Sequence, residues 1–280
     1  MPDQVLQLGN SEIQHGPAND RVYVMKLDKD NPDQALTEIE KLADREGYSK
    51  IFAKAPATVQ HVFVNRGYTC EAHIPHYYRG DTDLFFMSRF LDKEREKTTD
   101  AAQRREVLQL ARQKAEECDE SVTELPASCE QRVCNEGDIP QIVDVYRHVF
   151  ESYPFPIHDP GYIAKTMAVN VTYFGIWEDG KLIALASAER DLSADSVEMT
   201  DFATLPPARG RGLGVYLLQQ MEQEMKRAGV CTAYTIARAV SAGMNIVFAK
   251  QGYQFGGTLI NNTDICGTLE SMNIWWKRLG

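Results

Sequence analysis

The sequence predicts an α/β (α+β) fold in which helices flank a mixed, mostly antiparallel central sheet. Segments with the two-residue period of strands alternate with segments that carry apolar residues at helical spacing. In the second half, three strand-like segments follow one another with only short turns between them, which is typical of antiparallel strands. The chain of 280 residues, 43% hydrophobic and 25% charged, has a globular composition and suits one large or two medium domains.

The first part of the chain predicts helices between short strands. Pro32 fits the first turn of a helix, the apolar spacing that follows is helical, and Gly47 is a typical stop. The elements expected here, in order, are a strand at 21–27, a helix at 31–47, a strand at 50–55, a short helix at 57–67 and a strand at 83–91.

A charged segment separates this part from the rest. Residues 92–117 contain no glycine or proline and predict a solvent-facing helix, with a flexible linker as the alternative. We therefore expect a first domain at 1–91, a linker at 92–125 and a second domain at 126–280. Because 62–74 resembles 247–259, we interpret the first domain as a degenerate copy of the second.

The second domain has a clearer order of elements. A strand, a turn and a helix with Pro140 near its start come first, and the three strands of the meander follow. The later elements are those meander strands at 171–177, 182–190 and 197–205, a helix at 213–228, a strand at 231–239, a helix at 241–253 and a strand at 270–279.

Charge and hydropathy exclude several functions. The net charge is −10 and the pI is about 5.2, so binding to nucleic acid through a basic surface is not expected. There is neither a signal-peptide pattern nor an apolar run of membrane-spanning length, so we expect a cytoplasmic protein without a membrane partner. The histidines and cysteines do not form the paired pattern of a zinc site, so no metal is expected.

The segment "ARGRGLG" lies between the last meander strand and a helix. A glycine-rich turn that enters a helix leaves backbone N–H groups unpaired, and such groups bind anions. A Rossmann loop has Gly-x-Gly-x-x-Gly and a P-loop has Gly-Lys-Ser/Thr, and neither pattern is present. Arg209, Gly212 and Gly214 instead match Gln/Arg-x-x-Gly-x-Gly after an antiparallel strand.

This pattern, with the meander before it and the helix-strand-helix-strand order after it, resembles the GNAT superfamily of N-acetyltransferases. The resemblance covers about 130–280 and implies a GNAT acyltransferase fold that binds acetyl-CoA, with a degenerate GNAT-like domain before it. It implies a strand amide as oxyanion donor, and strand pairing between the pantetheine arm and Phe202, Ala203 and Thr204. It further implies that the diphosphate lies on Arg209, Gly210, Arg211, Gly212, Leu213 and Gly214, and that Asn245 contacts the cofactor.

Two acidic residues on the strand before the loop are the candidate catalytic groups. A lysine-like ammonium has a pKa of about 10.4, so only on the order of one in two thousand is neutral near pH 7 and a general base is needed. Glu198 lies where several GNAT enzymes carry that base. Asp201 points to the other face of an unbroken strand, but a bulge would bring both to the amine. Phe248 stands where many relatives have the tyrosine that protonates the thiolate, which leaves Tyr253, Tyr216 or water.

Two further segments are candidates for the amine site. Tyr153 and Phe155 in "ESYPFPIHDP" predict a rigid aromatic rim for a methylene chain. Asn261, Asn262 and Asn273 near the last hairpin predict amide contacts to a small zwitterion.

Together with "SAGMN", "INNT" and "ESMNIWWK", these segments make the whole chain resemble the β-lysine N6-acetyltransferase family. The resemblance implies a small diamino acid as acceptor, the compatible solute Nε-acetyl-β-lysine as product, and a metabolic link to lysine 2,3-aminomutase. A polyamine, peptide or protein acetyltransferase and a non-catalytic acetyl-CoA-binding sensor remain alternatives. Oligomeric state is open, with a homodimer among the options.

Overall fold

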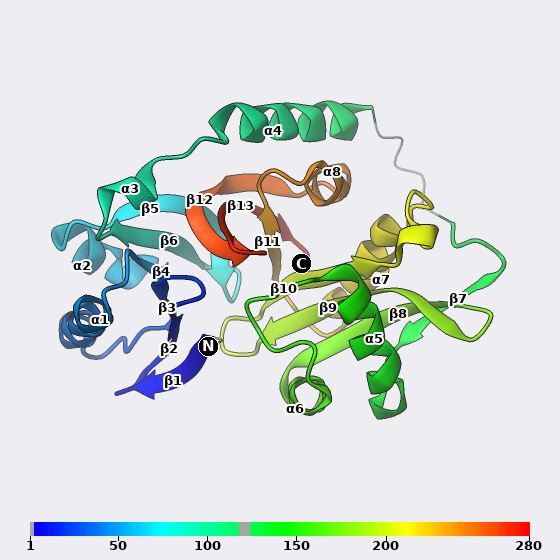
Figure 1. The fold of residues 1–280 in the computed structure, drawn as a ribbon, viewed down its shortest axis with the longest axis horizontal. Coiled ribbons are helices and arrows are strands. Elements are labelled where there is room, and N and C mark those ends of the chain that lie inside the picture. Colours follow the sequence, from blue (N-terminus) through cyan, green and yellow to red (C-terminus); the bar gives the residue numbers. More distant parts are fainter. Residues whose placement is uncertain (1–2, 118–123) are drawn as a thin grey trace.

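Thirteen strands of the part of the chain that the structure describes form one mixed sheet (Figure 1). The structure is a computed structural model that describes residues 3–117 and 124–280. The strands of the first half are β1 Gln4–Leu8, β2 Ser11–Gly16, β3 Arg21–Lys26, β4 Lys50–Pro56, β5 Thr69–Tyr78 and β6 Thr82–Phe90. Those of the second half are β7 Cys129–Val133, β8 Val171–Glu178, β9 Lys181–Asp191, β10 Ser196–Thr204, β11 Thr232–Arg238, β12 Gln254–Ile265 and β13 Thr268–Arg278.

When the sheet is followed inward from each edge, the strands of the two halves come in the same order, with β7 as an additional strand at one edge. The order is β1-β2-β3-β4-β6-β5-β12-β13-β11-β10-β9-β8-β7, so the two halves meet at β5 and β12. In each half a parallel pair, β3–β4 or β10–β11, is followed by an antiparallel hairpin, β5–β6 or β12–β13. This repeat agrees with an internal duplication, while the domain limits at 91 and 125 stay a prediction.

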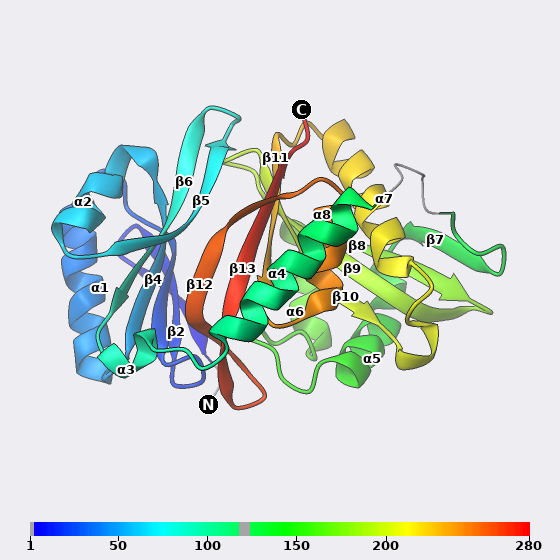
Figure 2. The same ribbon diagram turned by 90° about the horizontal axis from the view of Figure 1, so that it is seen from above.

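Helices connect the strands and cover the sheet (Figure 2). In both halves one helix joins the parallel strands, and a second precedes the hairpin. The helices are α1 Pro32–Glu46, α2 Gln60–Asn65, α3 Lys93–Glu96, α4 Ala101–Glu116, α5 Ile139–Val149, α6 Pro160–Val169, α7 Leu213–Arg227 and α8 Ala242–Lys250. Helix α4 belongs to the predicted linker, and it packs on α8 with Ala111 fully buried.

The junction between the halves requires a close approach of two backbones. Gly257 of β12 has φ +142° and pairs with Ala72 of β5, and a Cβ there would collide with the carbonyl oxygen of Glu71. Glu71 also forms an ion pair with the buried Lys50 at 2.7 Å and accepts a hydrogen bond from the backbone of Ile260 at 2.7 Å. The two halves therefore lie in fixed positions relative to each other.

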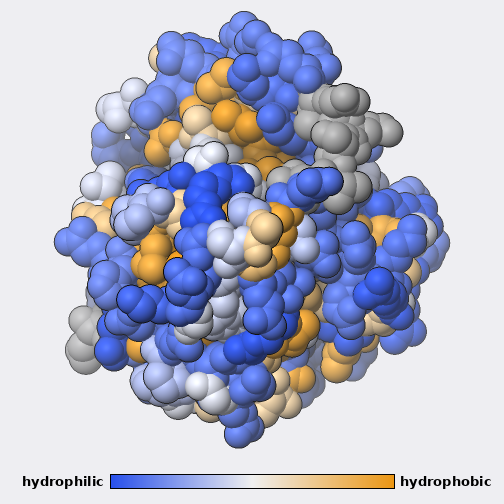
Figure 3. Space-filling model, turned by 90° about the vertical axis from the view of Figure 1, so that its right-hand side faces the viewer, coloured by the Kyte–Doolittle hydropathy of each residue, from blue (hydrophilic) through white to orange (hydrophobic). Residues whose placement is uncertain are grey.

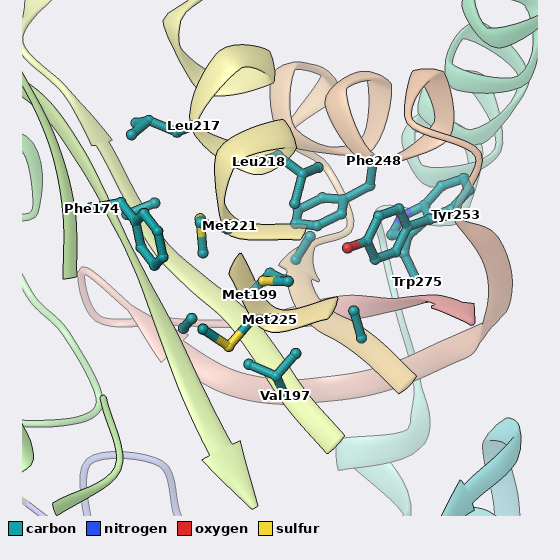
Figure 4. Close-up of a cluster of buried hydrophobic side chains, with 14 of the residues drawn as sticks. Phe174, Val197, Met199, Leu217, Leu218, Met221, Met225, Phe248, Tyr253 and Trp275 are labelled. Atoms are coloured by element: carbon teal, nitrogen blue, oxygen red, sulfur yellow. The ribbon is translucent and has the colours of Figure 1, made fainter. Parts of the chain in front are cut away.

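The core of the second half lies between α7, α8 and the sheet (Figure 4). The helical spacing of Leu217, Leu218, Met221 and Met225 places these side chains on one buried face of α7. They pack on Val197, Met199 and Phe174 from the strands beneath. This packing fixes the start of α7 against the end of β10, where the glycine-rich loop lies.

The surface at the β7 end of the sheet is mainly hydrophilic, with apolar residues exposed in several areas (Figure 3). This surface suits a chain of net charge −10. Among the described helices, none combines the length and the apolar character needed to cross a membrane.

The predicted meander is confirmed, because β8, β9 and β10 are antiparallel neighbours. The predicted helices 31–47 and 213–228 correspond to α1 and α7. The expected elements do not include β1, β2 and α6, because their short segments lack a clear period. They also lack bounds for β5 and β12, whose pairing is interrupted by register shifts. The predicted linker contains α3 and α4, and α4 is packed rather than fully solvent-facing; residues 118–123 of that linker lie outside the described residues.

Candidate active site

Strands β10 and β11 pair over only part of their length. The parallel register joins Ser196 to Thr232, Val197 to Ala233 and Glu198 to Tyr234, and it ends there. On its other side β10 continues to pair with β9 at residues 199–200 and 203–204. The edge of β10 that faces β11 is thus left without a strand partner after Glu198, as an extended ligand chain would require.

A bulge in β10 lies in this unpaired part. The register with β9 shifts between Thr200 and Ala203, and Asp201 has φ +54°. The predicted bulge is therefore present. It turns Asp201 to the same cavity that Glu198 borders, although regular alternation would place the two carboxylates on opposite faces.

A cavity of about 250 Å³ lies where the two strands separate. The second half contributes Glu198, Asp201, Tyr153 and Phe155, so the predicted catalytic carboxylates and aromatic rim are brought together. Other lining residues come from the first half, and they are Arg21, Tyr23, Met25, Phe52 and Lys54. Both halves of the chain therefore build one site.

Glu198 belongs to a hydrogen-bonded row that crosses from one half to the other. Lys54 Nζ donates to the Tyr234 hydroxyl at 2.7 Å, and this hydroxyl donates to Glu198 Oε2 at 2.8 Å. Burial raises the pKa of Glu198, while the Lys54 charge and the Tyr234 hydrogen bond oppose the rise. A carboxylate with a raised pKa is a better proton acceptor near neutral pH.

Asp201 is held by hydroxyl groups on two sides. The Tyr153 hydroxyl donates to Oδ1, and Ser187 Oγ donates to Oδ2 at 2.5 Å. Burial raises the pKa of Asp201, and these hydrogen bonds to the ionised form oppose the rise. Because both oxygens already accept hydrogen bonds, Asp201 is better placed to add negative charge to the cavity than to remove a proton.

A third carboxylate, missed in the sequence, completes an acidic wall. Glu189 of β9 lies opposite Glu198 in the strand register and also borders the cavity. Loss of hydration raises the pKa of Glu189, and the like charge of Glu198 adds to the rise. With Asp201, these residues place three carboxyl groups near the Lys54 ammonium, and in their ionised forms they favour a cationic amine.

The glycine-rich loop lies between β10 and α7. Gly210 has φ +78° and Gly212 has φ +75°, a backbone conformation that glycine adopts without strain. Gly212 precedes α7 without a side-chain cap, and its carbonyl accepts the first helical hydrogen bond from Tyr216. The N–H groups of the first turn are therefore available to an anion.

The two loop arginines bind protein groups. Arg209 Nε donates to the carbonyl oxygen of Thr204 at 3.1 Å. Arg211 forms a bidentate ion pair with Glu178 at 2.7 and 2.9 Å, and this pairing lowers the pKa of Glu178. The expected charge contribution of Arg211 to an anion is thereby largely neutralised, which leaves the loop amides as the main donors.

Asn245 differs from the prediction of a cofactor contact. Its Nδ2 donates to the carbonyl oxygens of Arg238 and Ser241 at 3.0 and 2.7 Å. Its Oδ1 accepts from Asn273 Nδ2 and Trp275 Nε1, both at 2.8 Å. The amide thus has no hydrogen-bonding capacity left for a ligand.

Two of the three predicted acceptor asparagines also have protein partners. Asn273 is fully buried and bonded to Asn245 and Thr258. Asn261 donates to the carbonyl oxygens of Arg95 and Lys97, so it ties the hairpin to α3. Only Asn262 of the three borders the cavity, and its buried Oδ1 lacks a hydrogen-bond partner.

The position of the expected general acid is apolar. Phe248 is fully buried against Phe202 and Tyr253, at 5.6 and 4.9 Å between ring centroids (Figure 4). The Tyr253 hydroxyl is buried within the core rather than lining the cavity. We therefore assign no side chain to protonation of the leaving thiolate.

Comparison with known proteins identifies the family. Residues 142–253 match the model of the acetyltransferase (GNAT) family. The chain is 39% identical over 275 residues to the β-lysine N(6)-acetyltransferase of Methanococcus maripaludis, and the match covers 98% of each chain. The chain belongs to the GNAT acetyltransferase family. It is an N-acetyltransferase, and its whole length resembles that relative.

The chain is also similar to two further N-acetyltransferases in sequence and to one solved structure in part of its fold. The N-acetyltransferase YodP of Bacillus subtilis is 33% identical over 267 residues, with 95% of each chain covered. The β-lysine N(6)-acetyltransferase of Methanosarcina mazei is 38% identical over 155 residues, which are 55% of this chain and 57% of that one. An N-acetyltransferase structure from Staphylococcus aureus Mu50 covers 55% of this chain and all of its own, with 19% identity and a TM-score of 0.49.

Proposed function

We propose that this enzyme transfers the acetyl group of acetyl-CoA to the N6 amine of β-lysine. The observation that carries the proposal is the cavity at the separation of β10 and β11, with Glu198 and Asp201 on its wall and the glycine-rich loop directly after β10. The two relatives named as β-lysine N(6)-acetyltransferases support the choice of acceptor.

The residues present fit acetyl-CoA. The unpaired amides at the start of α7 and the positive φ of Gly210 and Gly212 suit its diphosphate. The unpaired edge of Phe202, Ala203 and Thr204 suits its pantetheine arm. Acetyl-CoA supplies an activated thioester carbonyl, and the chain supplies the groups that position and deprotonate the amine.

In the mechanism that we propose, the acidic wall binds the ammonium and Glu198 accepts one of its protons. The neutral amine then attacks the thioester carbonyl carbon, so a C–N bond forms and the C–S bond breaks. CoA leaves as the thiolate, and the proton that the nitrogen loses in forming the amide passes to this thiolate through water. A backbone N–H of β10 is the donor for the developing oxyanion. Tyr234 and Lys54 orient Glu198 and keep its carboxylate available as a base.

The shape of the cavity favours a small amine over the alternatives. Its walls come from both halves of the chain, and the aromatic side chains Tyr23, Phe52 and Phe155 flank it. A protein acetyltransferase needs an open groove for a backbone, and a sensor does not need carboxylates beside the thioester. The location in the cytoplasm, the osmolyte role of the product and a link to lysine 2,3-aminomutase follow from the same proposal.

A CoA-release assay against β-lysine, α-lysine, spermidine and a peptide panel tests the proposal. We expect the highest kcat/KM with β-lysine. Peptides as best substrates, with β-lysine inert, would show a protein acetyltransferase instead. Acetyl-CoA binding without turnover of any amine would show a sensor.

A further inference from the structure

Arg21 is a buried cation without an anionic partner. It is 4% exposed, and within the described part of the chain no carboxylate forms an ion pair with it. Its Nη1 donates to the carbonyl oxygen of Asn262, and its buried Nε has no partner. The other buried cations of this half are paired, Lys50 with Glu71 at 2.7 Å and Arg95 with Asp20 at 3.1 Å.

The charge of Arg21 persists at neutral pH. Burial lowers its pKa to about 10, which leaves the guanidinium protonated. An unpaired buried charge is unfavourable unless an anion or a set of hydrogen bonds compensates it. Because Arg21 borders the cavity, its guanidinium is positioned to compensate the charge of an anion bound there.

Different charged groups line the cavity at different points along β3 and β4. Arg21, Tyr23 and Met25 line it from alternate positions of β3, and Phe52 and Lys54 do so from β4. Phe52 pairs with Tyr23 in register, so the backbones of Arg21 and Lys54 lie four residues, roughly 13 Å, apart along the strands. Lys54 leads through Tyr234 to Glu198, so Arg21 and Glu198 lie toward opposite ends of this wall.

Between these ends the wall is aromatic. Tyr23 and Phe52 stack with ring centroids 4.6 Å apart, and both rings lie beneath the Arg21 guanidinium at 5.4 and 5.5 Å. A cation, an apolar strip and a set of carboxylates in this order match a carboxylate, a methylene chain and a distal ammonium. The orphaned Oδ1 of Asn262, beside Arg21, matches an ammonium next to the carboxylate.

We propose that Arg21 and Asn262 form the subsite for the carboxylate and neighbouring ammonium of the amino-acid acceptor, so that the degenerate N-terminal half contributes the residue that selects for the carboxylate. The inference rests on the proposed function and deepens it. Arg21 binds the carboxylate through charge-assisted hydrogen bonds, and Asn262 Oδ1 accepts from the proximal ammonium. The distal amine is thereby directed to Glu198.

Calorimetric binding to the CoA-saturated full-length enzyme tests this directly. The probes are β-lysine, 1,4-diaminopentane, which is β-lysine without its carboxylate, and 6-aminohexanoate, which lacks the 3-amino group. Wild type should bind β-lysine roughly 10- to 100-fold more tightly than 1,4-diaminopentane. Equal affinities in wild type would overturn the inference without any variant.

The variants separate the two residues. Arg21→Gln should weaken β-lysine binding roughly 10- to 100-fold and leave 1,4-diaminopentane within about threefold, with partial rescue by Arg21→Lys. Asn262→Ala should reduce the preference for β-lysine over 6-aminohexanoate. The control Arg66→Gln removes an arginine of the same half that forms ion pairs with Asp33 and Glu40. It should change neither the affinity for β-lysine nor the preference over 6-aminohexanoate. Unchanged β-lysine binding in Arg21→Gln would contradict the inference.

Turnover distinguishes this inference from the function on which it rests. If β-lysine binds in an Arg21-dependent manner and is not acetylated, the subsite stands and the proposed function is wrong. If β-lysine is acetylated with the same KM by wild type and Arg21→Gln, the function stands and the subsite is wrong.

Discussion

Tyr234 donates its hydroxyl hydrogen to Glu198 at 2.8 Å, and these two residues are also the last pair in the register of β10 and β11. The strands separate immediately beyond this pair. The candidate base is therefore held at the point where the sheet opens, with its orientation fixed by a hydrogen bond from the neighbouring strand.

Glu198→Gln removes the candidate base and keeps its size. We expect kcat to fall roughly 10²- to 10⁴-fold, the usual contribution of a general base. The loss should be smaller at high pH, where more of the amine is neutral. Steady-state kinetics between pH 6 and 10 measure this.

The matched control is Glu222→Gln, which alters a half-buried glutamate of α7 that pairs with Lys277 away from the cavity. Its kcat should stay within a few-fold of wild type. An unchanged rate for Glu198→Gln at every pH would remove Glu198 as the base.

Tyr234→Phe should move the pH dependence of the reaction. Glu198 acts when ionised, so activity is lost as pH falls through its raised pKa. The hydrogen bond from Tyr234 stabilises the ionised form, and its removal raises that pKa further. The acidic limb of kcat/KM should therefore shift to higher pH. A limb at the wild-type position or below it would contradict the role of Tyr234.

Gly210→Ala tests the anion loop. Gly210 has φ +78° and open space around it, so alanine introduces backbone strain of about 1 kcal/mol without a steric clash. We expect KM for acetyl-CoA to rise severalfold while KM for the amine stays constant. Gly229→Ala is the control, because Gly229 has the same φ and equally open surroundings at the far end of α7. A similar KM for acetyl-CoA in both variants would contradict the role of the loop in binding acetyl-CoA.

Asn245→Ala should affect stability rather than cofactor binding. It removes four hydrogen bonds, two of them fully buried, and leaves the Asn273 amide and the Trp275 indole N–H without a shared acceptor. We expect the free energy of unfolding to fall by about 2–4 kcal/mol. Chemical denaturation measures this, and KM for acetyl-CoA at a permissive temperature should match wild type. A selective rise in that KM with unchanged stability would restore Asn245 as a cofactor ligand.

Local sequence patterns were sufficient to predict most strands and helices of the second half and the glycine-rich loop. The turns that separate β8, β9 and β10, the apolar face of α7 and the glycine spacing each depend on neighbours in sequence. The position of Asp201 could be stated only conditionally, because alternation puts it on the wrong face and the bulge that corrects this leaves no clear pattern in the sequence.

Local sequence patterns could not show that residues of the first half, such as Arg21 and Lys54, line the cavity. Lys54 and Tyr234 are 180 residues apart in the chain, and Arg21 meets Asn262 across 241 residues. A signal was present for Lys54, a charged residue between Ala53 and Ala55 within β4. Arg21 and Glu189 lie at or near the ends of β3 and β9, where charged residues are common and give no such signal. Their partners depend on how β5 meets β12, which period and composition do not determine. Asn273 shows the converse, because an amide that resembles a ligand is a buried core contact.

The position of acetylation is the most direct test of the site as a whole. Arg21 and Glu198 lie at opposite ends of the cavity, so the nitrogen far from the carboxylate should meet the thioester. The enzyme is incubated with β-lysine and acetyl-CoA, and the product is identified by NMR and tandem mass spectrometry. We predict acetylation at N6 alone. Acetylation at the 3-amino group, or no transfer to β-lysine, would contradict the arrangement proposed here.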